Sequence, residues 1–537
     1  MMFPRAFRFR MAAAAALVSL GLTALPAPAL AQVTAFKQAV AETVAEHDGL
    51  NDFYRARLFE PVWTGGEALH RDRRAMLIDA MRRVEAHGIP AARHDADRLY
   101  RMLRAADTPR ARGEAEVEMS LAYLRLARDL QTGILDPREV VRAIKRDPEA
   151  RSPEDLLARL GSEEPRALFR SLAPQSPEYV RLMATRVALE DQRARGGWGP
   201  AVRASKLSPG DSGEAVVALR NRLVSMGYLG HTSTAFYDRA MERAVRDFQE
   251  DHGQEIDGVA GDATLSALNV GIDERLKSVI VAMERERWMN RPGGLGERHI
   301  KVNLTEFKAR IYDDDKVTFE TRAVVGSRES DRQTPEFSDV MEFMEINPSW
   351  YVPRSIVVNE YLPMLRRNPY SVSHLEITDS RGRQVNRGRG FSQYSASSFP
   401  FSMRQPPGPK NALGSVKFMF PNRYNIYLHD TPAQSLFSRT VRTFSHGCVR
   451  LNDPHDFAYA LLAKQEADPV GFFQNHLGKR STVRVNLETK VPVHLIYRTA
   501  FTTAKGRTQY RDDIYGRDAQ IWRALEASGV SLGGLQS

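Results

Sequence analysis

The chain contains a single cysteine, Cys448, among 537 residues, so no disulfide can form within it. Exported proteins use cysteine mainly in disulfide pairs. A lone thiol is therefore either a buried, unreactive side chain or a group with a chemical role. The His-Gly pair before Cys448 and the arginine two residues after it favour the chemical role.

Long apolar runs are missing after the first 25 residues. Residues 1–10 are basic, 11–25 are apolar but too short to span a membrane confidently, and 29–31 read Ala-Leu-Ala. This order predicts a secretory signal peptide at 1–31, followed by a mature chain with no transmembrane segment. An uncleaved membrane anchor is the alternative. We therefore expect export to the periplasm and association with the cell wall.

Concentrated charge is also missing, although the net charge is +10. The basic residues are spread along the chain instead of forming one stripe, which is typical of solvated helix faces. Together with the predicted signal peptide, this argues against nucleic acid as a partner. An anionic polymer of the cell envelope fits the charge better.

Paired metal ligands at fixed spacing are absent as well. His429, His446 and Cys448, with Asp430 or His455, could be imagined around zinc, but structural zinc sites usually contain paired cysteines or histidines. We predict no metal and no cofactor. Ser445 lacks the Gly-x-Ser-x-Gly frame of a serine nucleophile.

The length and the changing periodicity predict a multidomain α+β protein. Residues 32–200 show helical spacing of apolar residues and no catalytic cluster, which indicates a scaffold domain. A Gly-rich break ends it, and residues 201–272 then predict a small three-helix module.

From residue 273 to 500 the apolar pattern changes to a period of two, which predicts a mostly antiparallel β domain. Within it, residues 354–404 interrupt the strand pattern and are expected to form a capping insertion or lid beside the site. Residues 501–537 are mostly polar and predict a tail with one short helix near Ile521–Leu525.

The thiolate of Cys448 would be the nucleophile, and an imidazole would take its proton. His429 ends a separate apolar strand and can approach the sulfur head-on, so we assign it as the base, with His446 in a supporting role. The N–H groups of Gly447 and Cys448 could stabilise an oxyanion, and the planar fork of Arg450 could hold a substrate carboxylate.

Less specific interpretations of these residues exist. His429 could be an ordinary histidine at a strand end. Arg450 could form a surface ion pair with Asp453 or Asp430.

Two sets of motifs resemble known families. Residues 427–431 (Tyr-Leu-His-Asp-Thr) followed by 445–451 (Ser-His-Gly-Cys-Val-Arg-Leu) resemble the signature of YkuD-type L,D-transpeptidases. Gly-Asp-Ser-Gly-Glu-Ala-Val and Asp-Gly-Val-Ala-Gly, within 201–272, resemble type 1 peptidoglycan-binding domains. The order of the domains is similar to that of the large Gram-negative YcbB-type members.

The resemblance implies an acyl transfer at Cys448. The cysteine would attack a tetrapeptide stem after its third residue, releasing D-alanine, and a second stem would resolve the thioester to a 3-3 cross-link. Carbapenems would acylate the same cysteine. By the same analogy Tyr427 lines the donor site, and we group Arg450, Ser445 and Asp430 with it as substrate-binding residues.

Other activities fit the same residues. Water as the acceptor would make the protein an L,D-carboxypeptidase, and a lysine acceptor would make it attach a lipoprotein to the stem. A non-catalytic wall-binding scaffold is the alternative from a different class. Expected partners are donor and acceptor peptidoglycan stems, with other cell-wall enzymes as further candidates.

Overall fold

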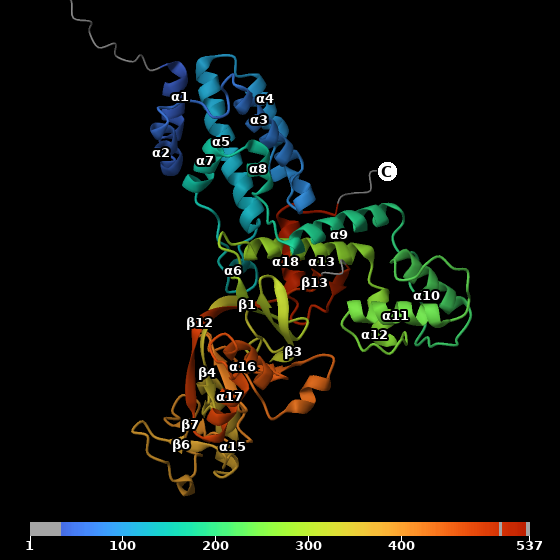
Figure 1. The fold of residues 1–537 in the computed structure, drawn as a ribbon, viewed down its shortest axis with the longest axis vertical. Coiled ribbons are helices and arrows are strands. Elements are labelled where there is room, and N and C mark those ends of the chain that lie inside the picture. The colour runs from blue at the N-terminus through green and yellow to red at the C-terminus, as the bar shows by residue number, and fades with distance from the viewer. Residues whose placement is uncertain (1–33, 504–506, 533–537) are drawn as a thin grey trace, which may run out of the picture.

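The computed structural model describes residues 34–503 and 507–532. The predicted signal peptide at 1–31 lies outside the described residues. The molecule is elongated, with a helical region at one end, a β domain in the middle of the long axis and a small capping region at the other end (Figure 1). Among the described residues, no helix combines the length and apolarity needed to cross a bilayer.

The helical region confirms the predicted scaffold domain and is built around one long helix, α5 (Pro109–Thr132). The Thr108 side chain accepts a hydrogen bond from the Ala111 N–H, and Pro109 takes the first helical position, so the start of α5 is fixed by its sequence. Much of α5 is buried by its neighbours. The other helices of this region are α1 (Ala35–Val44), α2 (Asp48–Ala56), α3 (Ala68–Arg82), α4 (Ala96–Arg104), α6 (Pro137–Val140), α7 (Pro153–Ser162), α8 (Pro165–Arg170) and α9 (Pro177–Ala194).

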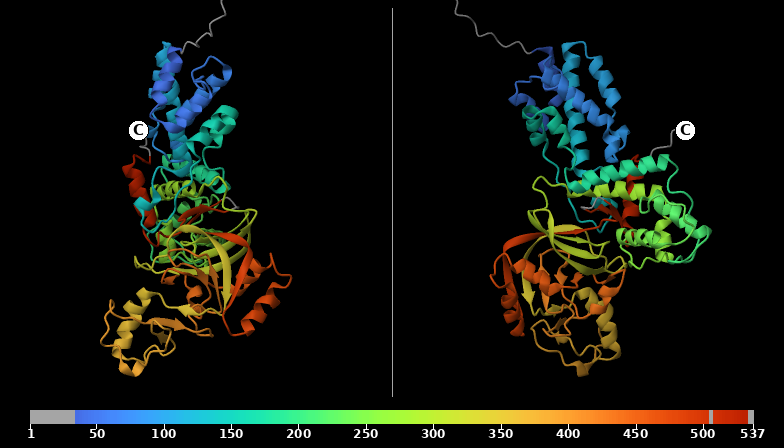
Figure 2. Two further views of the ribbon diagram at one scale, coloured as in Figure 1. Left: turned by 90° about the vertical axis from the view of Figure 1, so that its left-hand side faces the viewer. Right: turned by 45° about the vertical axis from the view of Figure 1, so that its right-hand side comes forward.

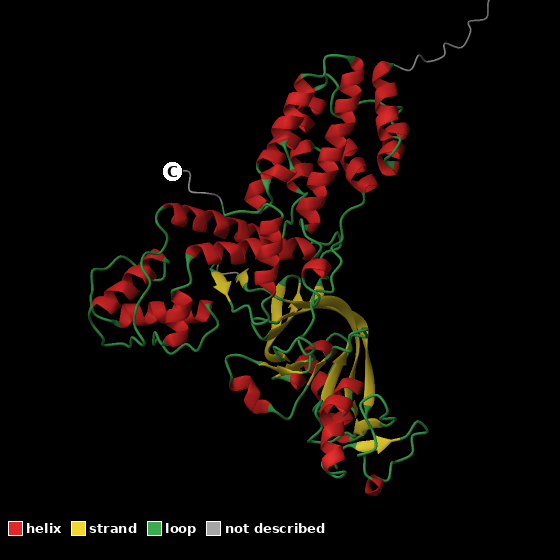
Figure 3. Ribbon diagram, turned by 180° about the vertical axis from the view of Figure 1, so that it is seen from behind, coloured by secondary structure: helices red, strands yellow, loops and turns green. Residues whose placement is uncertain are grey.

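The predicted three-helix module is also confirmed and projects to one side of the molecule (Figure 1). It consists of α10 (Glu214–Ser225), α11 (Arg239–Asp251) and α12 (Asp262–Leu268), which share their own apolar core. The next helix, α13 (Ile272–Met289), runs back along α9 and also contacts α5 (Figure 3). The first helix after the module therefore packs on the scaffold.

The β domain is a nine-stranded mixed sheet, mostly antiparallel, in the order β10-β3-β11-β9-β8-β4-β12-β1-β2. β2, at one end of this order, also pairs with β3, the second strand from the other end, so the sheet curls round and closes on itself. The strands are β1 (Arg298–Asn303), β2 (Lys308–Asp313), β3 (Lys316–Gly326), β4 (Phe337–Ile346), β8 (Val416–Met419), β9 (Leu428–His429), β10 (Thr443–Ser445), β11 (Val449–Leu451) and β12 (Val483–Ile496). α16 (Pro454–Leu462) and α17 (Pro469–Gly478) pack against it.

The capping insertion is a small subdomain with its own apolar core, at the end of the molecule farthest from the scaffold (Figure 2). A three-stranded sheet, β5 (Trp350–Tyr351), β7 (Ser402–Gln405) and β6 (Glu376–Thr378), lies beside a continuous helical segment, Arg354–Arg367. The aromatic rings of Phe391 and Phe399 fill its interior. The insertion is therefore a folded unit and not an open loop.

The C-terminal segment is more ordered than its polar composition predicts. β13 (Ala500–Thr502) pairs with β14 (Thr508–Tyr510), and α18 (Arg517–Ala527) packs on α13 and α6. The predicted short helix is thus longer and buries Trp522 and Leu525.

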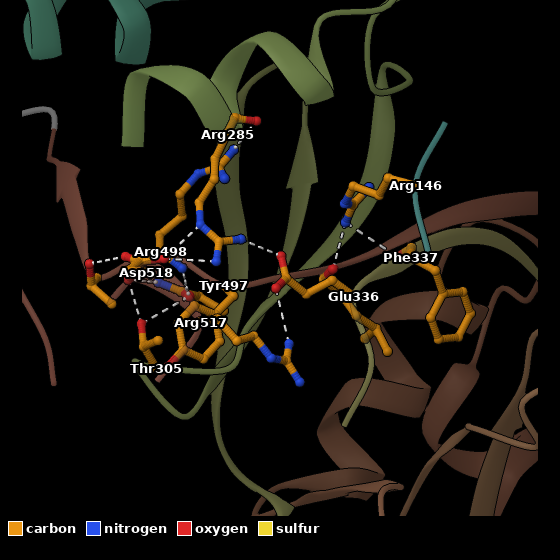
Figure 4. A network of polar contacts seen from close by, with 12 residues as sticks. Arg146, Arg285, Thr305, Glu336, Phe337, Tyr497, Arg498, Arg517 and Asp518 are labelled. Carbon is orange, nitrogen blue, oxygen red and sulfur yellow. Dashed lines mark hydrogen bonds and ion pairs between the residues drawn. The ribbon is translucent and has the colours of Figure 1, made fainter. Parts of the chain in front are cut away.

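A buried charged network joins these parts (Figure 4). Arg285 of α13 donates to Glu336 (2.6 Å) and to Asp518 of α18 (2.8 Å), and Arg517 donates to Glu336 (3.0 Å). From the scaffold side, Arg146 donates to the Phe337 and Leu495 carbonyls at 3.4 and 2.5 Å. Although burial acts to raise it, the two guanidinium groups hold the pKa of Glu336 below its usual value.

Candidate active site

The pairing of β9 with β11 gathers the predicted site residues on one face of the sheet. The strands run parallel, with Leu428 opposite Val449 and His429 opposite Arg450. Paired residues point to the same face and alternate residues to opposite faces. His429, Arg450, Tyr427 and Cys448 therefore lie on one face.

The other face of the same strands is core. Leu428, Val449, Leu451 and Phe418 are completely buried in the interior of the β domain. This alternation explains why a short segment such as Val449–Leu451 holds the site residues rigidly, since every second side chain is locked in the core.

The row of site residues continues onto β8. Lys417 lies opposite His429, and Glu345 of β4 lies opposite Lys417. The Lys417 ammonium is 2.9 Å from the Glu345 carboxylate and lies over the ring of Tyr427. Lys417 was not predicted as a site residue, although it alternates with two core residues in its strand.

The Cys448 thiol is half-buried, with Sγ 3.5 Å from the Asn425 carbonyl. Burial raises its pKa to about 11. Hydrogen bonds from the Tyr427 main chain and side chain, and the positive charge of Arg450, act in the opposite direction. The thiol is therefore protonated at neutral pH in this state, and Tyr427 is the residue arranged to stabilise the thiolate.

His429 is buried and oriented by the main chain. Its Nδ1 lies 2.5 Å from the Asp430 carbonyl, so Nδ1–H is the donor there and Nε2 keeps its lone pair. Burial, aided by Arg450, lowers its pKa to about 3. The imidazole is thus neutral and able to accept a proton. Within the described residues no hydrogen bond links it to Cys448 Sγ.

The loop before Cys448 is held by internal hydrogen bonds. The buried Ser445 hydroxyl donates to the Cys448 carbonyl (2.5 Å) and accepts from the Gly447 N–H (3.1 Å). These two bonds give Ser445 a role in holding the shape of the loop. Gly447 has φ of +117°, which favours glycine. Both the Gly447 and the Cys448 N–H groups were predicted as oxyanion donors. The Gly447 N–H is already bonded to Ser445, whereas the Cys448 N–H has no hydrogen-bond partner in the described part of the chain.

Thr334 supports this loop from behind. Its buried hydroxyl donates to the Gly447 carbonyl (2.7 Å) and accepts from the Gly326 N–H (2.9 Å). Arg517 of the buried network donates to the Thr334 carbonyl (2.7 Å). No sequence motif marked Thr334, because its partner lies 113 residues away.

His446 points to the capping subdomain. Its Nε2 is 2.6 Å from Glu360 Oε1, and Arg332 donates to the same oxygen at 2.9 Å. Glu360 lies in the capping helix and was not predicted to take part in the site. His446 thus links the loop that carries Cys448 to the capping subdomain.

Arg450 does not form the ion pair with Asp453 or Asp430 that was considered from the sequence. Its Nε is buried with no partner in residues 34–503 and 507–532. The Asp430 carboxylate accepts instead from the Ser415 N–H (2.8 Å) and from the Thr431 N–H (2.6 Å). Asp430 therefore has a structural role, through its side chain as well as its carbonyl.

The zinc arrangement considered from the sequence is not assembled. No group of three or more His, Cys, Asp or Glu side chains in the described ranges is placed to hold a metal ion.

Comparisons with known proteins identify three regions. The family model described as the YkuD L,D-transpeptidase catalytic domain matches residues 297–484, that of a scaffold domain matches 48–185, and that of a "putative peptidoglycan binding domain" matches 212–268. A curated relative from Haemophilus influenzae, named "Putative L,D-transpeptidase", is 33% identical over 225 residues. The match covers 41% of this chain and 45% of the relative, so less than half the length of that protein is spanned.

Two solved structures were also matched. An L,D-transpeptidase from Xylanimonas cellulosilytica is 16% identical, with 56% of this chain and 100% of that chain covered and a TM-score of 0.18. An L,D-transpeptidase from Stackebrandtia nassauensis is 14% identical, with 56% and 97% covered and a TM-score of 0.21.

Proposed function

We propose that this protein cross-links peptidoglycan stem peptides through Cys448, since residues 297–484 match the family model described as the YkuD L,D-transpeptidase catalytic domain. The observation that carries the proposal is the single row of Tyr427, His429, Cys448 and Arg450 on one face of the sheet. The putative peptidoglycan-binding domain at 212–268 supports peptidoglycan as the substrate, and the site of action would be the periplasm.

In the proposed reaction, Cys448 Sγ attacks the carbonyl carbon of the third residue of a tetrapeptide stem. The thiol proton passes to His429 Nε2, and the Cys448 N–H stabilises the oxyanion. The C–N bond then breaks, and His429 returns the proton to the leaving D-alanine amine. A thioester remains on Cys448.

In the second step, a side-chain amine of another stem attacks the thioester. His429 accepts a proton from the amine and passes it to the sulfur as the C–S bond breaks, which regenerates the thiol and leaves a 3-3 cross-link. Arg450, with its unpartnered buried Nε, supplies positive charge beside the thiol for a carboxylate of the stems.

The resting state fits this sequence of proton transfers. Burial keeps the thiol protonated and the imidazole uncharged, so the thiol proton is expected to move to His429 as the sulfur attacks the carbonyl and not before. Tyr427 would stabilise the thiolate during the attack.

The test is incubation of the purified mature chain with tetrapeptide-rich peptidoglycan, followed by muramidase digestion and mass spectrometry. We expect 3-3 cross-linked dimers and free D-alanine from wild type and neither from Cys448→Ala. A carbapenem adduct should form on Cys448 in wild type only. An adduct on Cys448→Ala would contradict the nucleophile assignment. Tripeptides without dimers would indicate the carboxypeptidase activity instead.

A further inference from the structure

A cavity of about 430 Å³ lies where the three-helix module meets the scaffold and the C-terminal segment. None of its lining residues belongs to the nine-stranded sheet that carries Cys448. It is therefore separate from the active site described above.

Aromatic rings and guanidinium groups from four parts of the chain line this cavity. Arg195 and Trp198 follow α9, Tyr228 follows α10, Arg275 lies on α13, and Tyr510 ends β14. The module alone therefore supplies only part of the lining. The arginines of the cavity come from outside the module, and the third of them, Arg507 of the C-terminal segment, lies over the Tyr228 ring and 3.6 Å from the Asp251 carboxylate.

Two of these arginines, Arg275 and Arg195, have N–H groups that are not used in hydrogen bonds among the described residues. The Arg275 guanidinium stacks on the Tyr510 ring at 4.3 Å and donates to the Ala267 carbonyl (3.0 Å). Arg195 donates to the Gln192 side chain (3.1 Å). Neither forms an ion pair with a carboxylate in the described part of the chain. Planar guanidinium groups with free N–H bonds are suited to binding carboxylates.

We propose that this cavity is a second peptidoglycan-binding site, which takes a carboxylate-bearing muropeptide. Its carboxylates bind Arg195 and Arg275, and its apolar faces pack on Trp198 and Tyr228. The cavity volume suits a fragment of a few sugar or amino-acid units. This inference rests on the proposed function for its ligand class, and it assigns peptidoglycan recognition to the junction of module and scaffold.

The test uses the mature full-length chain labelled with 5-fluorotryptophan and titrated with a disaccharide tetrapeptide released from peptidoglycan by muramidase. The chain has five tryptophans. Trp198 reports on the cavity, and Trp350, at the start of the cap, reports on the active-site side. A Cys448→Ala background prevents turnover. We expect the Trp198 fluorine resonance to move on titration, and the apparent Kd to rise about tenfold or more in Arg195→Ala/Arg275→Ala.

Arg243→Ala is the matched control, since Arg243 is an exposed arginine on α11 outside the cavity. A chitotetraose probe, which has no carboxylate, should bind weakly and equally to all variants. Should the double variant fail to fold, Arg195→Glu alone, at an exposed position, tests the same charge.

An unmoved Trp198 resonance, or equal affinity in wild type and the arginine variants, would overturn the proposal. A failure of the proposed function would give a different result. The chain with Cys448 intact would then release no D-alanine, while the Trp198 resonance would still move on titration.

Discussion

At the scale of single residues, the site depends on how burial shifts the pKa values of one thiol and one imidazole. Burial raises the pKa of Cys448 and lowers that of His429, so both are neutral at pH 7. Tyr427 is the neighbour that favours the thiolate through hydrogen bonding. The reactivity of Cys448 should therefore respond to changes at Tyr427.

We predict that alkylation of Cys448 by iodoacetamide rises with pH up to about 11, instead of levelling off near the value of a free thiol, about 8.5. Tyr427→Phe removes the phenolic donor and should move this profile to still higher pH and slow alkylation at pH 8 several-fold. Mass spectrometry of the alkylated peptide measures the rate. Tyr424→Phe, in the same segment, is the control. An unchanged profile in Tyr427→Phe would show that the phenol does not act on the sulfur.

The roles of residues near Cys448 were predictable from the sequence only where a local pattern carries them. The Ser-His-Gly-Cys block and the strand before His429 were enough to predict that Cys448 and His429 lie together, because strand alternation and spacing are local properties. The engagement of the Gly447 N–H by Ser445, and of His446 by Glu360, was not predictable. Those contacts depend on loop conformation and on a partner 86 residues away.

At the scale of elements, the loop Ser445–Cys448 is held from two sides. Thr334 supports it from the β domain, and Glu360 of the capping helix holds His446. The strands and the three-helix module were predictable because their apolar periods are regular. The position of α13 could not be predicted, because the amphipathic pattern of a helix does not specify which other element its apolar face packs against.

We predict that Thr334→Val leaves the Gly447 carbonyl and the Gly326 N–H unpaired and lowers kcat about tenfold with little change in KM. The valine keeps the shape of threonine but lacks the hydroxyl. Thr334→Ser should restore activity. A loss of thermal stability with unchanged kcat would contradict a positioning role.

Glu360→Ala should release the cap from the catalytic loop, because it removes the partner of both His446 and Arg332. We expect faster amide exchange in the helical segment Arg354–Arg367 and a several-fold higher KM for the donor stem. Asp379→Ala breaks an ion pair within an exposed turn of the same subdomain and serves as the control. Unaltered exchange in Glu360→Ala would show that other contacts hold the cap.

At the scale of the whole molecule, scaffold and β domain are joined by buried charges. Glu336 receives hydrogen bonds from Arg285 and Arg517, whose side chains are almost completely buried. Neither arginine belongs to a recognisable motif, so the junction could not be found from sequence patterns.

We predict that Glu336→Ala destabilises the protein by about 3–5 kcal/mol, because it leaves two buried guanidinium groups without their shared carboxylate. The midpoint of urea unfolding measures the effect. Glu342→Ala, on β4 six residues later, removes an exposed ion pair with Lys490 and should cost less than about 1 kcal/mol. Similar midpoints for both variants would contradict the importance of the buried network.

The free energy of unfolding should fall in acid, because several histidines are buried in their neutral form. Burial lowers the pKa of His87 to about 4, and that of His252, His429 and His494 to about 3. Between pH 6.5 and these values the unfolded chain binds more protons than the folded one, so stability falls as pH falls. Each histidine contributes at most about 1.4 kcal/mol per pH unit. His252→Gln should flatten the dependence of unfolding free energy on pH, and an unchanged slope would contradict this.

The network in Figure 4 also bears on the order in which the chain folds. Arg146 donates to the carbonyl of Leu495, 349 positions later, and Arg285 reaches Asp518 across 233 positions. Closing loops of this length is entropically costly, so such contacts form late. The helical scaffold can be complete early, whereas its attachment to the β domain must wait for α18. During synthesis, His429 and Cys448 would therefore be made before α18, whose Arg517 supports the loop that carries Cys448, can pack against the β domain.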